Sequence, residues 1–399
     1  MNINFHYYTV RALAQLAGFP PEEAQLIAEY SQFIDDYATR STIRVTQKPP
    51  QEAIESGLAK PDGRNWKIEL VTTGFMSTWD TAQLQWESVR RSMLIPFHFP
   101  PAAPLQPATE DIPISPAIMG DGSEVSNCLA TLQLSLAQGY GVRVNNLIYL
   151  GMLLHVFADT YAHQNFSGSH SKSANNYEIT NVKRYYNPSD QTLYHDQTTR
   201  YQNLNAAVAY KRLPAIGHGT VGHAPDDTYV SFNLVHQNTP GKIYARDNRD
   251  CFIQAAEQIY TLLRLCLPSA LRGPAWGAAL ADSIRKGFYA DNDLEESMVA
   301  MWSLIFPQIA FDYNPMEIMN RLFASPVNAE LSENDSELQR QTIEAIFNET
   351  GASAVSGKTE NSSQAGLTVI DTEVRREFYA FTLFADEWRH TIAGTLFPS

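Results

Sequence analysis

Cysteine is scarce in this sequence of 399 residues, which contains only Cys128, Cys251 and Cys266. The three are far apart and odd in number, and no Cys-x-x-Cys pair occurs. This pattern excludes a disulfide scaffold and makes a zinc site built from thiolates improbable. We interpret the cysteines as small buried apolar side chains.

Long apolar runs are also absent. No window reaches the ~18 uninterrupted apolar residues that a transmembrane helix requires. The N-terminus, Met1-Asn-Ile-Asn-Phe5, lacks the basic segment and the apolar segment of a signal peptide. We therefore expect a protein that is cytoplasmic where it is synthesised, and we leave open its export by a signal-independent secretion system.

Basic residues are in the minority and form no long run. The chain has 29 Lys and Arg against 43 Asp and Glu, a net charge of −14. Broad contact with nucleic acid requires many cations that neutralise phosphates, so no stable nucleic-acid binding is expected. A locally cationic metal cluster remains compatible with an acidic chain.

Helical patterns dominate, in a chain that is 44% hydrophobic and only 18% charged. They predict an all-α, multi-helix globular domain around a metal cluster, with a small β-hairpin insertion. The segment 143–166 is apolar on every face, which is typical of a central buried helix. The helices are expected at 7–16, 21–38, 81–93, 123–138, 143–166, 250–267, 276–288, 293–304, 314–323, 331–349 and 371–392.

Residues 1–350 are predicted to form the main helical domain. Within it, 42–73 reads as two short strands, the proline-rich 95–116 as a loop, and the polar 167–245 as long active-site loops. The small polar segment 351–366 is typical of a flexible connector. Residues 367–399 are expected to contribute a C-terminal helix that packs on the main domain.

His155, Asp159 and His163 are the strongest candidate site residues. At about 100° per residue their i, i+4, i+8 spacing places them in one stripe on a helix, a turn apart. This geometry suits a carboxylate shared between two metal ions, with one histidine for each ion. An aspartate in so apolar a helix is costly without a cation or donors. The alternatives are a buried hydrogen-bonded network and a His163 that only orients a ligand.

A glycine-rich loop carries His218, His223 and Asp226. Its glycines allow the backbone to bend so that both imidazoles converge. We predict that at least one of these histidines binds metal, and that Asp226 either binds metal or orients a histidine. The alternative is a turn with incidental histidines.

Four further candidates lie earlier in the chain. His6 precedes the first helix, and His98 is flanked by apolar residues that indicate an inward orientation. Asp35 and Asp36 lie near the end of the second helix, where acids oppose the helix dipole unless a cation is present. His236 is a minor candidate, and the remaining histidines are interpreted as surface or structural: His170, His195 and His390.

The order of these motifs resembles the zinc-dependent phospholipase C and single-strand-specific nuclease superfamily. The resemblance covers about residues 1–230. The segments FHYYTVRALAQLAGF and GHGTVGHAPD are also similar to an uncharacterised bacterial family related to that superfamily. The matching ligand order in this chain is His6, Asp35 or Asp36, His98, His155, Asp159, His163, then His218 or His223 with Asp226.

This resemblance implies two or three Zn²⁺ ions and a phosphoesterase. The expected reaction is a phospholipase C-like hydrolysis of a phospholipid or a small phosphodiester by a metal-bridged hydroxide, with possible contact to a membrane surface. By resemblance, Asp35 or Asp36 is the candidate general base. The alternatives are a single-strand nuclease of the same superfamily and a non-catalytic, metal-stabilised interaction protein. The sequence does not indicate an oligomeric state.

Overall fold

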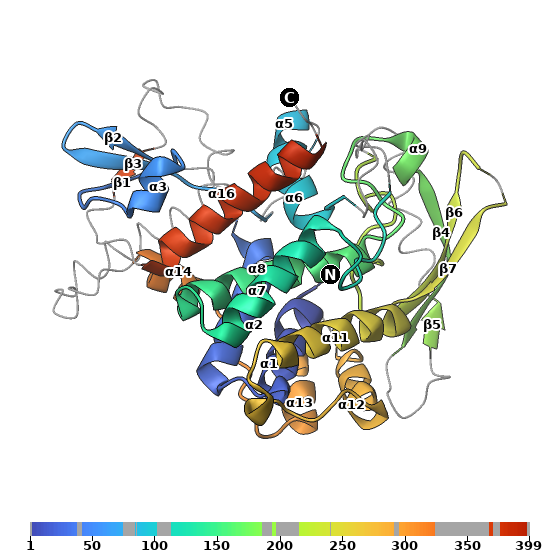
Figure 1. The fold of residues 1–399 in the computed structure, drawn as a ribbon. Coiled ribbons are helices and arrows are strands. Elements are labelled where there is room, and N and C mark those ends of the chain that lie inside the picture. Colours follow the sequence, from blue (N-terminus) through green and yellow to red (C-terminus); the bar gives the residue numbers. More distant parts are fainter. Residues whose placement is uncertain are drawn as a thin grey trace. The chain divides into compact units, whose positions relative to one another are not determined.

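The computed structural model describes residues 2–37, 42–74, 84, 86–101, 113–185, 194–196, 215–239, 241–290, 295–323, 367–369 and 376–396. Figure 1 shows its elements in chain order. The chain divides into two compact units. The first unit comprises residues 1–32, 84–313 and 392–399, and the second comprises 33–83 and 314–391.

The first unit is built around α8 (Arg143–Ala162), which is buried along nearly its whole length. Helix α7 (Glu124–Gln138) packs against α8, and α11 (Asn248–Leu265) packs against both α8 and α1 (Val10–Ala17). An apolar helix without a polar face is stable only when other elements cover it on all sides. The described part of this unit also contains the helices η1 (Asn4–Thr9), α5 (Glu87–Val89), η2 (Arg90–Leu94), α6 (Ile95–His98), α9 (Lys172–Asn175), η3 (Ser269–Leu271), α12 (Ala278–Gly287) and α13 (Glu295–Ile305).

A four-stranded antiparallel sheet also belongs to the first unit, in the order β5-β4-β6-β7. Its strands are β4 (Tyr177–Tyr185), β5 (Tyr194–Asp196), β6 (Val230–His236) and β7 (Ile243–Asp247). Residues in β6 alternate strictly between buried and half-buried. The prediction that 167–245 consists of loops is therefore wrong for these strands, because their period-two alternation was hidden among Asn, Tyr and Gly residues.

The second unit holds the other sheet, in the order β2-β3-β1-β8. The strand β3 (Asn65–Glu69) pairs antiparallel with both β2 (Ala59–Asp62) and β1 (Thr42–Val45), and β8 (Leu367–Val369) lies parallel to β1. The predicted small β insertion at 42–73 is thus present, with a third strand of its own and a fourth from near the C-terminus. Among its described residues, this unit contains the helices α3 (Gln51–Glu55), α14 (Pro315–Phe323) and most of α16 (Arg376–Leu396).

The protein is mostly helical, as the sequence predicts, but its β content exceeds one hairpin. Helix α2 (Pro21–Asp36) begins at its proline and runs from the first unit into the second. Proline also fits the start of α6, where Pro96 lies in the first turn, so the loop predicted at 95–116 contains a short helix. The predicted helix at 331–349 and the predicted connector at 351–366 lie outside the described residues.

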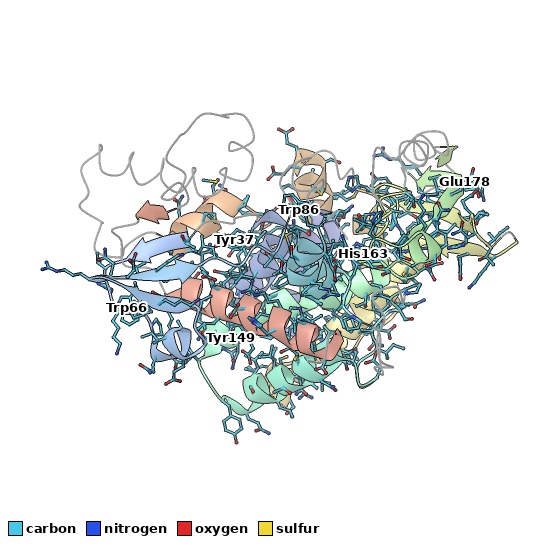
Figure 2. All side chains as sticks on the ribbon, turned by 90° about the horizontal axis from the view of Figure 1, so that it is seen from above. Tyr37, Trp66, Trp86, Tyr149, His163 and Glu178 are labelled. Atoms are coloured by element: carbon cyan, nitrogen blue, oxygen red, sulfur yellow. The ribbon has the colours of Figure 1, made fainter. Side chains whose placement is uncertain are left out.

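Figure 2 shows the side chains of the described residues, among them Trp66 of β3 and His163 at the end of α8. Cys266 is buried, as predicted, whereas Cys128 and Cys251 are half-buried. Among the helices that the structure describes, none is both long and apolar enough to cross a membrane.

Candidate metal centre

Four buried side chains from three elements of the first unit meet in what we call the inner cluster: His6, His98, His155 and Asp159. His6 comes from η1, His98 from the end of α6, and His155 and Asp159 from one face of α8. A helical turn separates the two α8 residues, so the i, i+4 spacing places both side chains on the same side. The sequence thus sets this pair locally, and folding adds the other two histidines.

Asp159 is the centre of the inner cluster. Its Oδ1 lies 3.1 Å from His6 Nε2, and its Oδ2 lies 3.0 Å from His98 Nδ1 and 3.3 Å from His155 Nε2. The rings of His6 and His155 are stacked with their centroids 3.9 Å apart. Three ring nitrogens therefore converge on one carboxylate, in a region that excludes water.

A backbone carbonyl of α2 fixes the orientation of the His155 ring. His155 Nδ1 lies 2.8 Å from the carbonyl oxygen of Ser31. Gly151 permits this approach, because a Cβ there would lie 2.4 Å from the carbonyl oxygen of Ile27. A carbonyl only accepts, so Nδ1 carries a proton, and in the neutral ring Nε2 presents a lone pair to Asp159.

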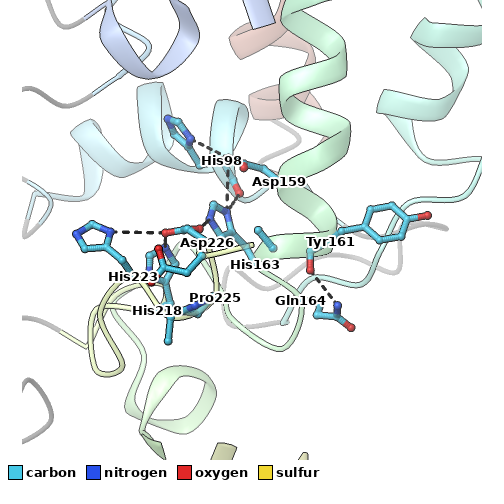
Figure 3. A network of polar contacts seen from close by, with 12 residues as sticks. His98, Asp159, Tyr161, His163, Gln164, His218, His223, Pro225 and Asp226 are labelled. Atoms are coloured by element: carbon cyan, nitrogen blue, oxygen red, sulfur yellow. Dashed lines mark hydrogen bonds and ion pairs between the residues drawn. The ribbon is translucent and has the colours of Figure 1, made fainter. Parts of the chain in front are cut away.

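A second group lies between the end of α8 and the glycine-rich loop that comes later in the chain. It consists of His163, His218 and Asp226, and we call it the outer cluster. His163 Nε2 is 3.0 Å from Asp226 Oδ1, and His218 Nε2 is 3.3 Å from Asp226 Oδ2. Figure 3 shows Asp226 between His163 and His223, with His98 and Asp159 of the inner cluster nearby. The Nε2 atom of His163 faces Asp226, while its Nδ1 atom lies 3.7 Å from Asp159 Oδ2.

Backbone carbonyls also fix both histidines of the outer cluster. His163 Nδ1 is 2.6 Å from the carbonyl oxygen of His98, and His218 Nδ1 is 2.7 Å from that of Gly222. Gly217 holds the loop in place, with a φ of +51° and a position where a Cβ would lie 2.5 Å from the Phe99 ring. In the neutral ring each Nε2 atom therefore presents a lone pair to Asp226, as in His155.

The charges in both clusters favour a cation. Burial, together with the charge of His155, lowers the pKa of His6 to about 3. Burial also lowers the pKa of His218 to about 4, although Asp226 opposes the shift. For Asp159 and Asp226 burial would raise the pKa, but the surrounding histidines outweigh it and hold both values well below the usual range.

The ionised carboxylates lie at hydrogen-bond distance from imidazole ring nitrogens, which present lone pairs to them when the rings are neutral. Two acceptors at this distance repel each other unless a proton or a cation lies between them. Metal-binding histidines commonly donate their other ring N–H to a backbone carbonyl, the contact that His155, His163 and His218 all make. The nitrogen and oxygen donors of both clusters thus fit a divalent cation.

Among the first-unit residues selected from the sequence, His223 belongs to neither cluster. The side chain of His223 is 88% exposed, and its Nδ1 is 3.7 Å from Asp226 Oδ2, so the expected convergence of both loop histidines is only partial. Asp35 and Asp36 are the last two residues of α2 and belong to the second unit. Their role as ligand or general base stays a prediction.

The remaining histidines are spread over the fold. His236 Nε2 lies 2.8 Å from the carbonyl oxygen of Ser173, which gives this buried ring a structural contact. His170 is exposed and makes a β-bridge with Ile216, His195 lies in β5, and His390 is exposed on α16.

The structure adds residues that sequence reasoning missed. Arg246 is buried and donates to the carbonyls of Tyr161 at 2.9 Å, Ala162 at 2.7 Å and Pro225 at 3.2 Å. It therefore ties the residue before His163 to the residue before Asp226. Asn248 donates to the carbonyls of Ala224, Pro225 and Asp227, and Asn175 donates to those of Ser167, Ser169 and Ala215. A single Arg or Asn residue shows no sequence pattern that predicts such side-chain hydrogen bonds to backbone carbonyls.

We expect Arg246→Met to weaken the outer cluster. The variant keeps much of the side-chain volume but removes the donors to three buried carbonyls, at about 1–3 kcal/mol for each group left unsatisfied. Metal analysis of the purified variant is expected to show at least one ion fewer than in the wild type. Arg285→Met is the control, because its guanidinium pairs with Asp250 on an exposed surface. Full metal content in Arg246→Met would show that Arg246 is not needed to hold the outer cluster.

The chain belongs to DUF6765, a family of unknown function, whose profile matches residues 1–394. The match covers both units and therefore includes every residue of the inner and outer clusters. No curated protein and no solved structure matches the chain. The chemistry of the site must therefore be argued from the clusters themselves.

Proposed function

We propose that this DUF6765 protein is a metal-dependent phosphoesterase whose inner and outer clusters each hold a divalent cation, most suitably Zn²⁺. The supporting observation is that two ionised carboxylates, Asp159 and Asp226, face the Nε2 atoms of imidazole rings. Backbone carbonyls bind the Nδ1 atoms of the same rings and so set their orientation. All the donors are nitrogen and oxygen atoms. A closed structural zinc site more often uses thiolates, so this donor set favours a catalytic site.

Bound cations would supply two things to phosphodiester hydrolysis: a water of lowered pKa and neutralisation of charge on the phosphoryl oxygens. The residues of the chain hold and orient the site. Asp159 and Asp226 provide its negative charge, and the carbonyls of Ser31, His98 and Gly222 keep the ring nitrogens aimed at them. The buried position of the inner cluster keeps bulk water out, which strengthens electrostatic interactions there.

The substrate side of the site is the glycine-rich loop. The side chain of His218 is 19% exposed, and the exposed ring of His223 lies beside Asp226. We assign phospholipid or a small phosphodiester as the substrate class on the resemblance to zinc-dependent phospholipases C, and contact with a membrane surface belongs to the same proposal. The net charge of −14 disfavours a nuclease, which needs a cationic track for the nucleic-acid backbone. Asp35 or Asp36 is the general base proposed by the same resemblance.

A substrate panel tests this proposal. The purified protein is assayed for metal content and for turnover of bis-nitrophenyl phosphate, phosphatidylcholine and single-stranded DNA, each with and without a chelator. We expect chelator-sensitive turnover of the first two substrates. Cleavage of DNA alone would support the nuclease alternative, and bound metal without turnover would support a metal-stabilised interaction protein.

The matched variants for this assay are His155→Ala and His170→Ala. His155 lies in the inner cluster, whereas His170 is an exposed histidine of the same unit. Loss of turnover in the first variant and its retention in the second would attribute the activity to the cluster. Equal activity in both variants would show that a contaminating hydrolase produces the signal.

A further inference from the structure

We propose that the two clusters have different tasks: the inner cluster holds a permanent ion that stabilises the first unit, and the outer cluster holds an exchangeable ion that meets the substrate. This inference rests on the proposed function only in that both clusters bind cations. It assigns separate roles to residues that lie in one continuous array.

The first argument is burial. In the inner cluster the side chains of His6 and His155 are 0% exposed, that of Asp159 is 1% exposed, and that of His98 is 6% exposed. In the outer cluster the side chain of His163 is 5% exposed, that of Asp226 is 10% exposed and that of His218 is 19% exposed. An ion among fully buried ligands leaves only when the fold opens, whereas an ion with partly exposed ligands exchanges with solvent directly.

The second argument is the kind of element that carries the ligands. The inner ligands lie on η1, α6 and α8, which are helical segments from three distant parts of the chain. An ion there joins these segments, so its binding energy contributes to folding. Two of the three outer ligands, His218 and Asp226, lie in a loop of turns. Backbone turns open at a lower free energy than packed helices do.

His98 connects the clusters, in addition to the contact of His163 Nδ1 with Asp159 Oδ2 at 3.7 Å. His98 faces Asp159 with its ring, and its backbone carbonyl orients His163 of the outer cluster. Loss of the inner ion therefore disturbs His98 and, through it, His163. His6 and His155, by contrast, hold Asp159 from elements outside the loop, so loss of the outer ion leaves the inner ligands in place. The clusters should fill in the order inner, then outer.

Timed chelation of the wild-type protein tests this order. The metal-loaded protein is mixed with an excess of chelator, and samples are desalted at intervals for metal analysis, turnover of bis-nitrophenyl phosphate and melting temperature. We expect two phases that differ at least tenfold in rate. Turnover should disappear with the fast phase, while most of the fall in melting temperature should accompany the slow phase.

His218→Ala is the matched variant, because it removes one partly exposed outer ligand and leaves all the inner ligands. We expect it to lack the fast phase, to retain the slowly released ion and to melt near the wild-type temperature. His155→Ala should lose both ions, and His170→Ala should behave as the wild type. If His155→Ala does not fold, the wild-type kinetics and His218→Ala still decide the question.

Two results would overturn the inference while leaving the proposed function intact: release of all the metal in one phase, or loss of both ions in His218→Ala. A slow phase that carries the turnover would overturn it as well. A wild-type protein that binds no metal would instead overturn the proposed function, and this inference with it. The metal and melting measurements need no knowledge of the natural substrate.

Discussion

Asp159→Asn is expected to lose its bound metal and to melt about 5–10 °C below the wild type. An amide supplies one neutral oxygen where the carboxylate supplies two charged ones, and its NH₂ group would face the ring nitrogens of His6, His98 and His155. Ligand linkage gives the scale, since an ion present at 100 times its dissociation constant stabilises the fold by about 2.7 kcal/mol. Each kcal/mol corresponds to a few degrees in a unit of this size. Turnover should fall at least ~10³-fold if the site is catalytic.

Metal analysis and calorimetry on the same preparation measure both effects. The matched control is Asp386→Asn, which removes another buried aspartate from a helix, one that pairs with Arg389 in the second unit. The control should keep the full metal content. An Asp159→Asn protein with wild-type metal content and an unchanged melting temperature would remove Asp159 from the ligand set.

Acidification is expected to destabilise the metal-free protein strongly. The pKa of His6 is about 3 and that of His218 about 4 in the folded state, both below the usual 6.5. Between pH 6.5 and these values the two histidines are protonated in the unfolded chain but stay neutral in the folded protein. The free energy of unfolding therefore falls as the pH falls. From pH 7.5 to 5.0 the loss is about 2 kcal/mol for each histidine. The lowered pKa values of Asp159 and Asp226 extend the loss below pH 4.

Chemical denaturation of chelator-treated protein at several pH values measures this dependence. His6→Gln cannot take up this proton. Its free energy of unfolding should therefore fall by about 2 kcal/mol less than that of the wild type from pH 7.5 to 5.0. A free energy of unfolding that stays constant from pH 7.5 to 5.0 would show that these rings are not held neutral in the folded state.

Local sequence information was enough to predict most helices. The apolar run at 143–166 predicted the central buried helix, and the structure gives α8 over Arg143–Ala162 with nearly every residue buried. Ser123 was expected at the start of a helix, and its side chain accepts a hydrogen bond from the backbone N–H of Ser126 at the start of α7. The sheet β5-β4-β6-β7 was missed, although β6 alternates over seven residues, because neighbouring Asn, Tyr and Gly residues made the whole region look like loop.

The candidate site divides in the same way. His155 and Asp159 share a face because they are four residues apart on a helix, which the sequence alone determines. His6 and Asp159 are 153 positions apart, and His163 and Asp226 are 63 apart. Such pairs depend on how distant segments pack, and no local periodicity encodes them. The selection of histidines and acids came from residue type and context, whereas their division into an inner and an outer cluster came from the fold.

The sequence by itself determined the helical core, the stripe on α8 and the chemical type of the donors, because these follow from residue type and helical spacing. Only the tertiary structure decided that Asp159 faces His6 and His98, that His163 turns to Asp226, and that Arg246 ties α8 to the loop. These contacts join segments whose meeting depends on burial of the whole chain. The carbonyls of Ser31, His98 and Gly222, which fix the tautomers, are backbone groups that every residue type carries, so no sequence pattern reveals them.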